Sequence, residues 1–499
     1  MKLYLIGHEY KYAVEQMIST LFPLEKPEYL NLKKRKGLGS SGAMQISLSS
    51  GEKNITAYCV YFSDEGVWRG RASSQIADIK NDTDRDSICQ KIIKTAVYRA
   101  VLRSGRARPP WGALTGVRPG KLMHAIMLDH PDKAEAVNEF MSTYDVSYKR
   151  AQLCYETSLY THDAQQYLQP EDICLYVGIP FCPTRCAYCS FVSQSVEKSM
   201  TLVTPFMEAL FKELTSVAFQ VKVLGLRVVS IYMGGGTPTT LSAPQLDELC
   251  TRLENEFDLS ALREYTVEAG RPDTITPEKL QVLKQHGVDR VSVNPQSMRD
   301  SVLDAIGRKH TAADIESALE KVKQTGSIAV NMDLIAGLPS DDIQGFKYSI
   351  DKVLSLSPEN ITVHTLSLKR GSGIMRGGTA VPGAEEVSEM LDYAYKRLRE
   401  EGYSPYYLYR QKNMSGGFEN TGWTKKGYVN LYNICMMEEL CTILAMGGGG
   451  STKLIKCGNG KNSRITAPKY PLEYIEQIAK TCEGKKKISE FYNNTQQED

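Results

Sequence analysis

Gly178-Ile-Pro-Phe-Cys182-Pro-Thr-Arg-Cys186-Ala-Tyr-Cys189 is a stretch with three cysteines at the spacing C-x3-C-x2-C. It follows a short apolar run, Ile173 to Ile179, that predicts a strand, and its proline and arginine predict an irregular loop. Thiolates grouped on such a loop suit an iron–sulfur cluster or a zinc ion. Structural zinc sites usually have two pairs of ligands, and no second C-x2-C pair follows, so the pattern favours a cluster over zinc or over three buried packing cysteines.

A four-iron cluster held by only three thiolates leaves one iron without a protein ligand. Such an open iron is what a cluster needs if it has to bind and reduce a substrate.

From Ile173 onward, strand patterns alternate with helix patterns. Strands are predicted at 173–178, 228–233, 264–269, 289–294, 328–335 and 360–366. Helices are predicted at 201–223, 244–256, 277–286, 312–325, 342–355 and 385–401. This alternation implies an α/β fold with a parallel sheet, and six units fit a partial (β/α)6 barrel better than an eight-unit barrel. Barrels of this kind place their chemistry at the carboxyl ends of the strands, where the cysteine loop lies.

Three domains are expected: an N-terminal α+β domain with a helical linker at 1–168, the partial barrel at 169–400, and a mostly helical C-terminal domain at 401–499. In the first, strands are predicted at 3–6, 44–48 and 55–62, and helices at 12–21, 87–103, 134–140 and 147–168, with a basic loop at 33–42. The turn-rich segment 103–121 reads as a linker, although its arginines could also hold an anion. In the last domain, 430–446 is predicted to be helical, and the glycines at 447–450 predict a tight turn or a close backbone approach to a ligand.

The composition excludes several classes of function. There are 60 basic and 58 acidic residues, so the charge gives no case for binding nucleic acid. No apolar run approaches the ~18 residues of a membrane span, and the N-terminus lacks a signal-peptide pattern. Twelve cysteines in 499 residues, three of them clustered, fit a reducing compartment better than a disulfide scaffold. A cytoplasmic protein is expected.

Polar and glycine motifs follow the predicted strands of the barrel. Gly234-Gly235-Gly236-Thr237-Pro238 follows the second strand, where a backbone without side chains can press against a bound group. Glu268 ends the third strand, Gln296 follows the fourth, and Asp333 lies on the apolar fifth strand, where an unpaired carboxylate would be costly. Generic turns and surface carboxylates are the alternative interpretation of each motif taken alone.

Together these motifs resemble a known family. The C-x3-C-x2-C spacing with Tyr188 before the third cysteine resembles the radical S-adenosylmethionine (SAM) enzymes. The segment YVGIPFCPTRCAYCSF resembles the oxygen-independent coproporphyrinogen III oxidase, or coproporphyrinogen dehydrogenase, family. PWGALTGVRPGK and YYLYRQKNMSGGFENTGW resemble a branch of that family with a longer N-terminal region. The resemblance implies a [4Fe-4S] cluster on Cys182, Cys186 and Cys189, and one or two molecules of SAM.

The resemblance also implies roles for individual residues. Tyr176 and Glu268 are expected to be catalytic. The residues expected to bind SAM are Tyr176, Tyr188, Gly235, Gly236, Thr237, Glu268, Gln296, Arg308 and Asp333. The glutamine departs from the family pattern, because the usual G-x-Q is Asn294-Pro295-Gln296 here.

The implied activity is oxidative decarboxylation of coproporphyrinogen III. A 5′-deoxyadenosyl radical from SAM would abstract hydrogen from two propionates in turn, leaving the vinyl groups of protoporphyrinogen IX in haem biosynthesis. An electron donor such as flavodoxin or ferredoxin is expected, while the oligomeric state is not set by the sequence. Two alternatives stay open: a haem-binding chaperone of the same family, and another radical reaction on a tetrapyrrole, such as haem degradation.

A substrate with four carboxylates calls for cationic groups in its pocket. The candidates are Lys369, Arg370, Arg376 and Arg410, with Arg103, Arg106, Arg108 and Arg118 as further possibilities. A glycine-rich segment at 370–383 could cover the barrel mouth as a lid. If the protein binds haem, His310, His364 and Cys435 are the available axial ligands. Cys435 and Cys441, six apart on a predicted helix, fit packing better than ligation.

Overall fold

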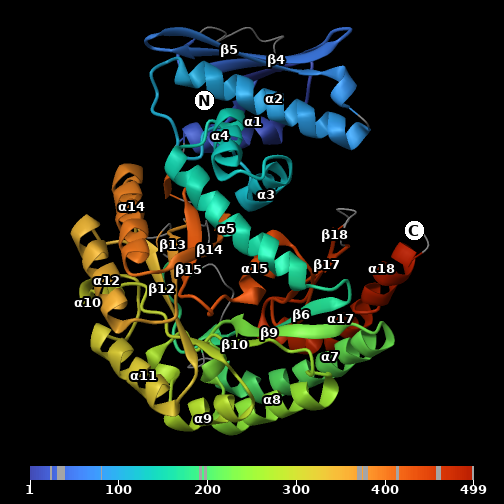
Figure 1. Cartoon of the computed structure of the whole chain (residues 1–499), viewed down its shortest axis with the longest axis vertical. Coiled ribbons are helices and arrows are strands. Elements are labelled where there is room, and N and C mark those ends of the chain that lie inside the picture. The colour runs from blue at the N-terminus through green and yellow to red at the C-terminus, as the bar shows by residue number, and fades with distance from the viewer. Residues whose placement is uncertain are drawn as a thin grey trace. The chain divides into compact units, whose positions relative to one another are not determined.

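The computed structural model describes residues 1–22, 25–30, 40–79, 81–189, 194–195, 199–367, 374, 380–411, 415–456 and 462–496. The chain forms two compact units (Figure 1). The first comprises Met1–Pro119, Ala125–Leu153 and Arg410–Phe418, and the second comprises Gly120–His124, Cys154–Tyr409 and Glu419–Asp499. The expected three-part division at 168 and 400 stays a prediction.

The first unit contains a five-stranded sheet in the order β2-β1-β3-β4-β5. Its strands are β1 (Lys2–Ile6), β2 (Glu28–Tyr29), β3 (Ala43–Ser50), β4 (Asn54–Ser63) and β5 (Gly66–Gln75). Helices α1 (Lys11–Leu21) and α2 (Asp82–Leu102) pack on the sheet around one apolar core. The strand β5 was not predicted, because its sequence GVWRGRASSQ is mostly polar or small. Of the loop expected at 33–42, residues 33–39 lie outside the described residues.

Three helices follow along the chain: α3 (Pro119–Asp129), α4 (Lys133–Tyr144) and α5 (Tyr148–Tyr167). The last two were predicted, whereas α3 begins inside the segment interpreted as a linker. Pro119 occupies the first turn of α3, a position where its missing N–H costs no hydrogen bond.

The second unit contains the predicted parallel sheet. Its six central strands are β6 (Asp172–Ile179), β9 (Arg227–Gly235), β10 (Glu264–Val267), β11 (Arg290–Ser292), β12 (Ala329–Ala336) and β13 (Asn360–Thr365). They are hydrogen-bonded to one another in sequence order and run parallel. This is the arrangement of a partial (β/α)6 barrel, and each predicted strand agrees with the observed one to within two residues.

Helices cover the outer, convex face of this sheet (Figure 1). They are α7 (Val203–Val223), α8 (Ala243–Glu256), α9 (Pro277–Gln285), α10 (Asp300–Ala305), α11 (Ala312–Thr325), α12 (Ile343–Leu356) and α14 (Ala384–Glu400). All except the short α10 were predicted. Side-chain caps at Ser242, Thr276, Thr311 and Asp342 begin four of them, which is why their first residues could be found from the sequence.

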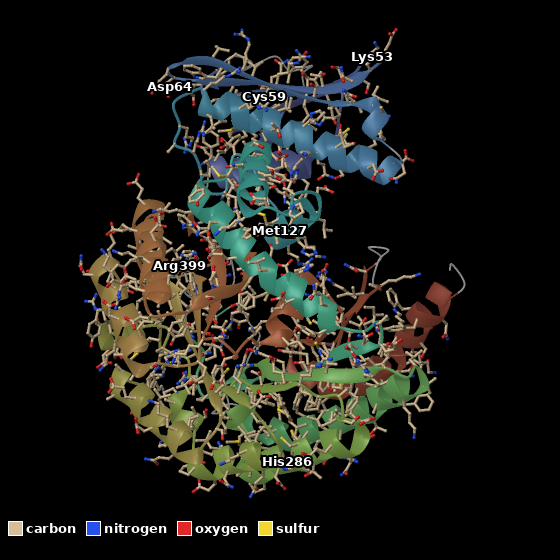
Figure 2. All side chains as sticks on the ribbon, viewed as in Figure 1. Lys53, Cys59, Asp64, Met127, His286 and Arg399 are labelled. Carbon is tan, nitrogen blue, oxygen red and sulfur yellow. The ribbon has the colours of Figure 1, made fainter. Side chains whose placement is uncertain are left out.

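Neighbouring outer helices are also linked by polar contacts. His286 lies at the end of α9 (Figure 2). It is 3.0 Å from Asp247 and 2.8 Å from Glu254 on α8. The two carboxylates raise the pKa of His286 above its ordinary value, although burial alone would lower it.

The sheet continues beyond the barrel strands on both sides. Beside β13 lie the antiparallel β15 (Glu419–Thr424) and then β14 (Ser404–Arg410). Beside β6 lies β16 (Thr442–Gly447), parallel to it, followed by β17 (Ser451–Ile455) and β18 (Asn462–Thr466). The C-terminal region thus adds strands to the barrel sheet, together with the helices α16 (Pro471–Glu476), α17 (Ile478–Gly484) and α18 (Lys487–Gln496).

The prediction of one helix over 430–446 was wrong. A short helix, α15 (Leu431–Glu438), ends at Glu439, which has a left-handed φ of 56°, and the chain continues as β16. The apolar run TILAMG is buried throughout between β6 and β17. A short, uniformly apolar run does not distinguish a buried helix from a buried strand, which explains the error.

The helix α15 lies on the concave side of the sheet, opposite the outer helices (Figure 1). Its first N–H groups donate to Glu264 on β10, at 2.5 Å from Leu431 and 3.3 Å from Tyr432. Arg290 on β11 lies 3.2 Å from the same carboxylate. A buried ion pair therefore fixes the start of α15 inside the barrel, because the helix N-terminus also favours negative charge.

Candidate active site

The cysteine loop begins where β6 ends. Cys182 belongs to the two-residue strand β7 (Phe181–Cys182), and the Cys189 N–H donates to the Cys186 carbonyl at 3.1 Å. Among the described residues none of the three forms a disulfide, and all three are half-buried. The loop therefore presents three thiols at the carboxyl end of the first barrel strand, as the sequence predicted.

Two arginines hold this loop from other strand ends. Arg271, just after β10, donates to the Thr184 hydroxyl at 2.8 Å and pairs with Asp273 at 3.0 Å. Arg308, after α10, donates to the Tyr188 hydroxyl at 3.1 Å. Both arginines are buried, so they fix the loop more firmly than exposed ones would. The sequence analysis missed Arg271, and its position directly after the Glu268 motif is the only signal that could have indicated it.

The glycine turn after β9 lies directly against the cysteine loop. A side chain at Gly236 would approach the Ile179 carbonyl to 2.7 Å, and Gly235 has a φ of +100°, so both positions require glycine. The Thr237 N–H donates to the Phe181 carbonyl at 2.7 Å, and its hydroxyl lies 3.6 Å from the Cys182 sulfur. The glycine turn and the cysteine loop, about fifty residues apart in the sequence, are therefore hydrogen-bonded to each other and packed together.

Glu268 follows β10 and faces the strand beside it. Its carboxylate accepts a 2.6 Å hydrogen bond from Tyr232 on β9 and lies over Gly234, where a side chain would contact it. Burial raises the pKa of Glu268 to about 7, and the nearby Asp333 adds to the effect, while the Tyr232 hydrogen bond opposes it. A carboxylate in this state gains from a cationic partner, which would favour its ionised form.

Tyr176 belongs to a stack of three tyrosines inside the barrel. Its ring lies 6.3 Å from those of Tyr232 on β9 and Tyr432 on α15, and the latter two lie 4.4 Å apart. A side chain at Gly235 would lie 3.2 Å from the Tyr176 hydroxyl, so this phenol reaches the glycine turn. The stack forms a layer below the strand ends, and sequence reasoning missed two of its three members.

Gln296 and Asp333 are joined through the backbone. The Gln296 N–H donates to the Asp333 carbonyl at 2.8 Å, and Gln296 has a left-handed φ of 68°. Asn294, two residues earlier, accepts from the Asp333 N–H at 3.3 Å and from Arg308 at 2.6 Å. The departure from G-x-Q therefore leaves the glutamine beside the aspartate, in a conformation that glycine would adopt more easily.

Asp333 has the partner that its burial requires. His364 on β13 lies 3.6 Å from its carboxylate, and Asn331 donates to it at 2.8 Å. Burial alone would raise the pKa of Asp333, but His364 and these hydrogen bonds hold it below its ordinary value. Asp333 is thus ionised at neutral pH. Arg308 donates hydrogen bonds to Asn294, Gly270 and Tyr188, and the basic partner of Asp333 is His364.

The run Gly447–Gly450 also reaches this edge, because β16 runs parallel to β6. A side chain at Gly447 would meet the Gly178 carbonyl, and one at Gly448 would lie 2.7 Å from Pro180. These glycines therefore permit a close backbone approach to the start of the cysteine loop.

None of the four residues first proposed to contact the substrate is placed at this site by the described part of the structure. Lys369, Arg370 and Arg376 lie outside the described residues. Arg410 is buried, and its guanidinium donates to the carbonyls of Leu114 at 2.6 Å and Gly417 at 2.7 Å, so it serves the fold of the first unit.

Three of the other arginines considered for anion binding have partners within the first unit. Arg106 lies over the Phe22 ring at 4.2 Å, and Arg108 pairs with Asp145 at 3.0 Å. Arg103 donates to a backbone carbonyl on β5.

The candidate haem ligands are separated from one another. His310 is buried near Arg308 and Arg271, and burial and these charges lower its pKa to about 3. His364 pairs with Asp333, while Cys435 lies on α15 inside the barrel. The structure therefore brings the predicted cluster and SAM residues to one edge of the sheet, but does not group these three.

The comparisons with known proteins agree with this geometry. A family model described as the radical SAM superfamily matches residues 176–353. The oxygen-independent coproporphyrinogen-III oxidase-like protein HemZ of Bacillus subtilis is 40% identical over 78% of this chain and 79% of its own.

Other relatives have a different described role. The heme chaperone HemW of Lactococcus lactis is 32% identical over 46% of this chain and 60% of its own, and that of Escherichia coli is 24% identical over 64% and 81%. Among solved structures, the coproporphyrinogen III oxidase HemN of Escherichia coli matches with a TM-score of 0.51 at 20% identity, over 65% of this chain and 73% of that one. Within the described residues, no helix is long and apolar enough to cross a bilayer.

Proposed function

Because the chain belongs to the radical SAM superfamily, in its group of oxygen-independent coproporphyrinogen III oxidase-like proteins, we propose that it decarboxylates coproporphyrinogen III. The superfamily uses a [4Fe-4S] cluster and SAM, and its relatives here have tetrapyrrole-related roles. The observation that supports the proposal best is the 40% identity to an oxidase-like protein over most of both chains.

Cys182, Cys186 and Cys189 would hold the cluster. Three thiols on one loop fit a cluster with three protein ligands, and hydrogen bonds from Arg271 and Arg308 hold that loop in place. When bound, the cluster and SAM supply the one-electron chemistry that removes a hydrogen atom from the substrate.

The residues around the loop would bind and orient SAM. The glycine turn at 234–236 offers backbone groups at close range, and Thr237 lies beside Cys182. Glu268, with its raised pKa, suits the cationic end of SAM, and ionised Asp333 suits a hydroxyl or a second cation. Gln296 and Tyr188 would complete the SAM site, and Tyr176 would lie beneath it.

The reaction would convert two propionate side chains into vinyl groups. Each propionate loses one hydrogen atom, one CO2 and one electron, and that electron passes to an external acceptor. An electron carrier of the flavodoxin or ferredoxin class would reduce the cluster. The buried layer of tyrosines below the strand ends would exclude water from the base of the site.

A haem chaperone is the second candidate. The identities to several heme chaperones, one of them covering 81% of its own chain, favour this alternative. Such a protein would keep the cluster site but bind haem without turnover.

An anaerobic assay tests the first proposal. The full-length protein with a reconstituted cluster is given SAM, a reductant and coproporphyrinogen III, and 5′-deoxyadenosine, CO2 and porphyrin products are followed by mass spectrometry. The expected result is the loss of two carboxyl groups, abolished by Cys186→Ala and unaffected by Cys482→Ser, which lies outside the motif.

Two other outcomes would contradict the proposed decarboxylation. Cleavage of SAM without change in the porphyrinogen would overturn the substrate and leave the class, and haem would then be the next substrate to test. An intact cluster with haem bound and no SAM cleavage would replace the enzyme with the chaperone.

A further inference from the structure

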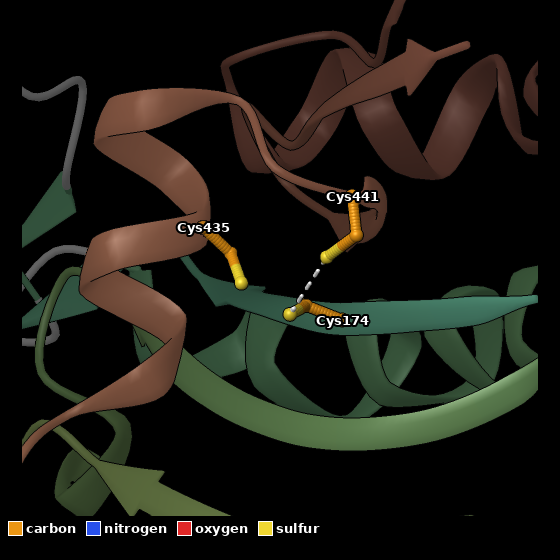
Figure 3. Close-up of side chains that lie close together, drawn as sticks. All are labelled: Cys174, Cys435 and Cys441. Carbon is orange, nitrogen blue, oxygen red and sulfur yellow. Dashed lines mark hydrogen bonds between the residues drawn. The ribbon is translucent and has the colours of Figure 1, made fainter. Parts of the chain in front are cut away.

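A second group of cysteines lies inside the barrel, apart from the C-x3-C-x2-C loop. Cys174 comes from β6, Cys435 from α15, and Cys441 directly precedes β16 (Figure 3). All three are buried, with exposed fractions of 0%, 0% and 3%. Their sulfurs lie within 4.8 Å of one another, and the Cys174 and Cys441 sulfurs are 3.6 Å apart.

The convergence follows from the fold and not from the sequence spacing. In the parallel pairing of β16 with β6, Ile443 faces Cys174, which brings Cys441 to the same end of the strand. The chain reverses direction at Glu439, between α15 and β16, and this turn places α15 over both strands. The strand β6 therefore brings one thiol to the two that the neighbouring segments α15 and β16 supply from about 260 residues later, as Figure 3 shows.

The spacing of the sulfurs suits a single ion. An ion with bonds of about 2.3 Å to sulfur holds tetrahedrally arranged sulfurs about 3.8 Å apart. The 3.6 Å between Cys174 and Cys441 is close to this value, and the third sulfur needs only a small adjustment. Soft thiolates in an apolar shell select thiophilic ions over Mg²⁺ or Ca²⁺.

The surrounding charges favour a divalent ion. Three thiolates with one divalent cation carry one net negative charge, and Lys453 lies close by, 3.1 Å from the Met436 carbonyl next to Cys435. The acidic neighbours are already compensated, since Asp172 pairs with Arg227 at 2.6 Å and Glu264 with Arg290 at 3.2 Å. The site is thus electrically balanced when a divalent ion occupies it.

Tyr432 supplies an independent indication. Tyr432 belongs to the same buried cluster as the three cysteines, and within the described part of the chain its buried hydroxyl has no hydrogen-bond partner. Leaving a buried hydroxyl unpaired costs about 1–3 kcal/mol. A small polar ligand in the fourth position of the ion, such as a water molecule, would accept this hydrogen bond.

We propose that Cys174, Cys435 and Cys441 bind one thiophilic divalent cation of the Zn²⁺ class, which fastens α15 and β16 to β6. The site is structural, and it is separate from the cysteine loop at the strand ends. Because the metal joins residues 267 positions apart, its binding free energy adds to the stability of the folded chain.

The test uses the full-length chain with Cys182→Ala, Cys186→Ala and Cys189→Ala, which removes the competing motif. Under anaerobic, reducing conditions this protein is titrated with Zn²⁺ against a chromophoric chelator, and with Cd²⁺ to observe the thiolate-to-metal charge-transfer absorption. Native mass spectrometry counts the bound ions. One equivalent is expected, with affinity lowered at least about 100-fold by an added Cys435→Ser or Cys441→Ser.

The matched control is Cys250→Ser, an equally buried cysteine on α8 that contacts Tyr265. It should leave metal binding unchanged. The thermal unfolding temperature of the protein with all three inner cysteines should rise on addition of Zn²⁺, and this measurement does not depend on whether the serine variants fold.

Three outcomes would overturn the proposal. The first is that the three-alanine protein binds no metal ion tightly. The second is that its bound ion is retained in both serine variants. The third is that Zn²⁺ does not change the unfolding temperature. Any of these would leave the three cysteines as packing residues.

Discussion

The Tyr232 hydroxyl donates a 2.6 Å hydrogen bond to the Glu268 carboxylate, linking the inner tyrosine layer to the end of the neighbouring strand. This contact orients Glu268 over the glycine turn at 234–236. It is the point where the packed interior of the barrel meets the proposed SAM site. The burial that positions Glu268 also raises its pKa to about 7, which makes the effect of pH on this group testable.

Glu268→Gln should stabilise the ligand-free protein at high pH. The folded pKa of Glu268 is raised from 4.5 to about 7, so its contribution to stability is full below pH 4.5 and is lost as pH rises through 7. The glutamine variant avoids this loss. We expect the free energy of unfolding of the variant to exceed that of the original protein by about 2 kcal/mol at about pH 8.5, and to differ little from it at about pH 5. The expected gain is smaller than the full pKa shift implies, because water screens part of the effect at this half-buried side chain.

Urea unfolding at the two pH values measures this difference. The control is Glu278→Gln, an exposed residue in the first turn of α9, which should not give the same pH dependence. A glutamine variant that is destabilised equally at both values would contradict the assignment of the raised pKa to Glu268.

Arg271→Met should weaken the cysteine loop without unfolding the barrel. The substitution removes the 2.8 Å bond to Thr184 and the pairing with Asp273, while its apolar side chain still fills the buried position. We expect less iron bound per chain after reconstitution and faster loss of the cluster to a chelator. Arg252→Met, at an exposed arginine on α8, is the control, and equal iron retention in the two variants would exclude this role.

Gln296→Gly and Gln296→Ala separate the backbone of this position from its side chain. Both remove the amide, but only glycine adopts the φ of 68° without strain. The glycine variant should be about 1 kcal/mol more stable than the alanine variant. If the side chain binds SAM, both variants should lose the same affinity in calorimetry; a loss confined to alanine would mean that the backbone, not the amide, matters.

Lys485→Met should destabilise the second unit strongly. Lys485 lies 2.9 Å from Glu213, both side chains are almost fully buried, and the lysine also donates to the Ala445 carbonyl on β16. Removing the lysine leaves a buried carboxylate without its cation, at a cost of about 3–5 kcal/mol. Adding Glu213→Leu should recover much of this loss, and denaturant unfolding of the two variants would refute the idea if the second change made the protein less stable still.

Much of the barrel could be predicted from the sequence, for physical reasons that are specific to it. Its strands are short apolar runs buried on both faces, and its helices begin at side-chain caps such as Ser242 and Thr311. The C-terminal strands could not be predicted, because pairing with β6 decides whether TILAMG becomes a strand, and that partner lies about 270 residues earlier. Polar β5 is a strand for the same reason, through its pairing with β4.

The candidate site was predictable where residues follow strands in order. Glu268, Asp333 and the glycine turn reach one edge because parallel strands end together. Residues that act through a distant partner gave no local signal: Arg271 contacts Thr184, and Tyr432 on α15 stacks on Tyr232 on β9. The inner cysteines belong to this second group, since their grouping depends on the turn at Glu439.

The parallel pairing of β6 with β16 bears on the order of events during synthesis. The strand that leads into Cys182 emerges from the ribosome long before Thr442–Gly447, the strand that covers its second edge. The nascent chain thus presents its cysteine loop on a strand with one open side, and long-range pairing of this kind forms late. The barrel sheet is therefore completed late in synthesis, because β6 gains its second neighbour only after Thr442–Gly447 has been made.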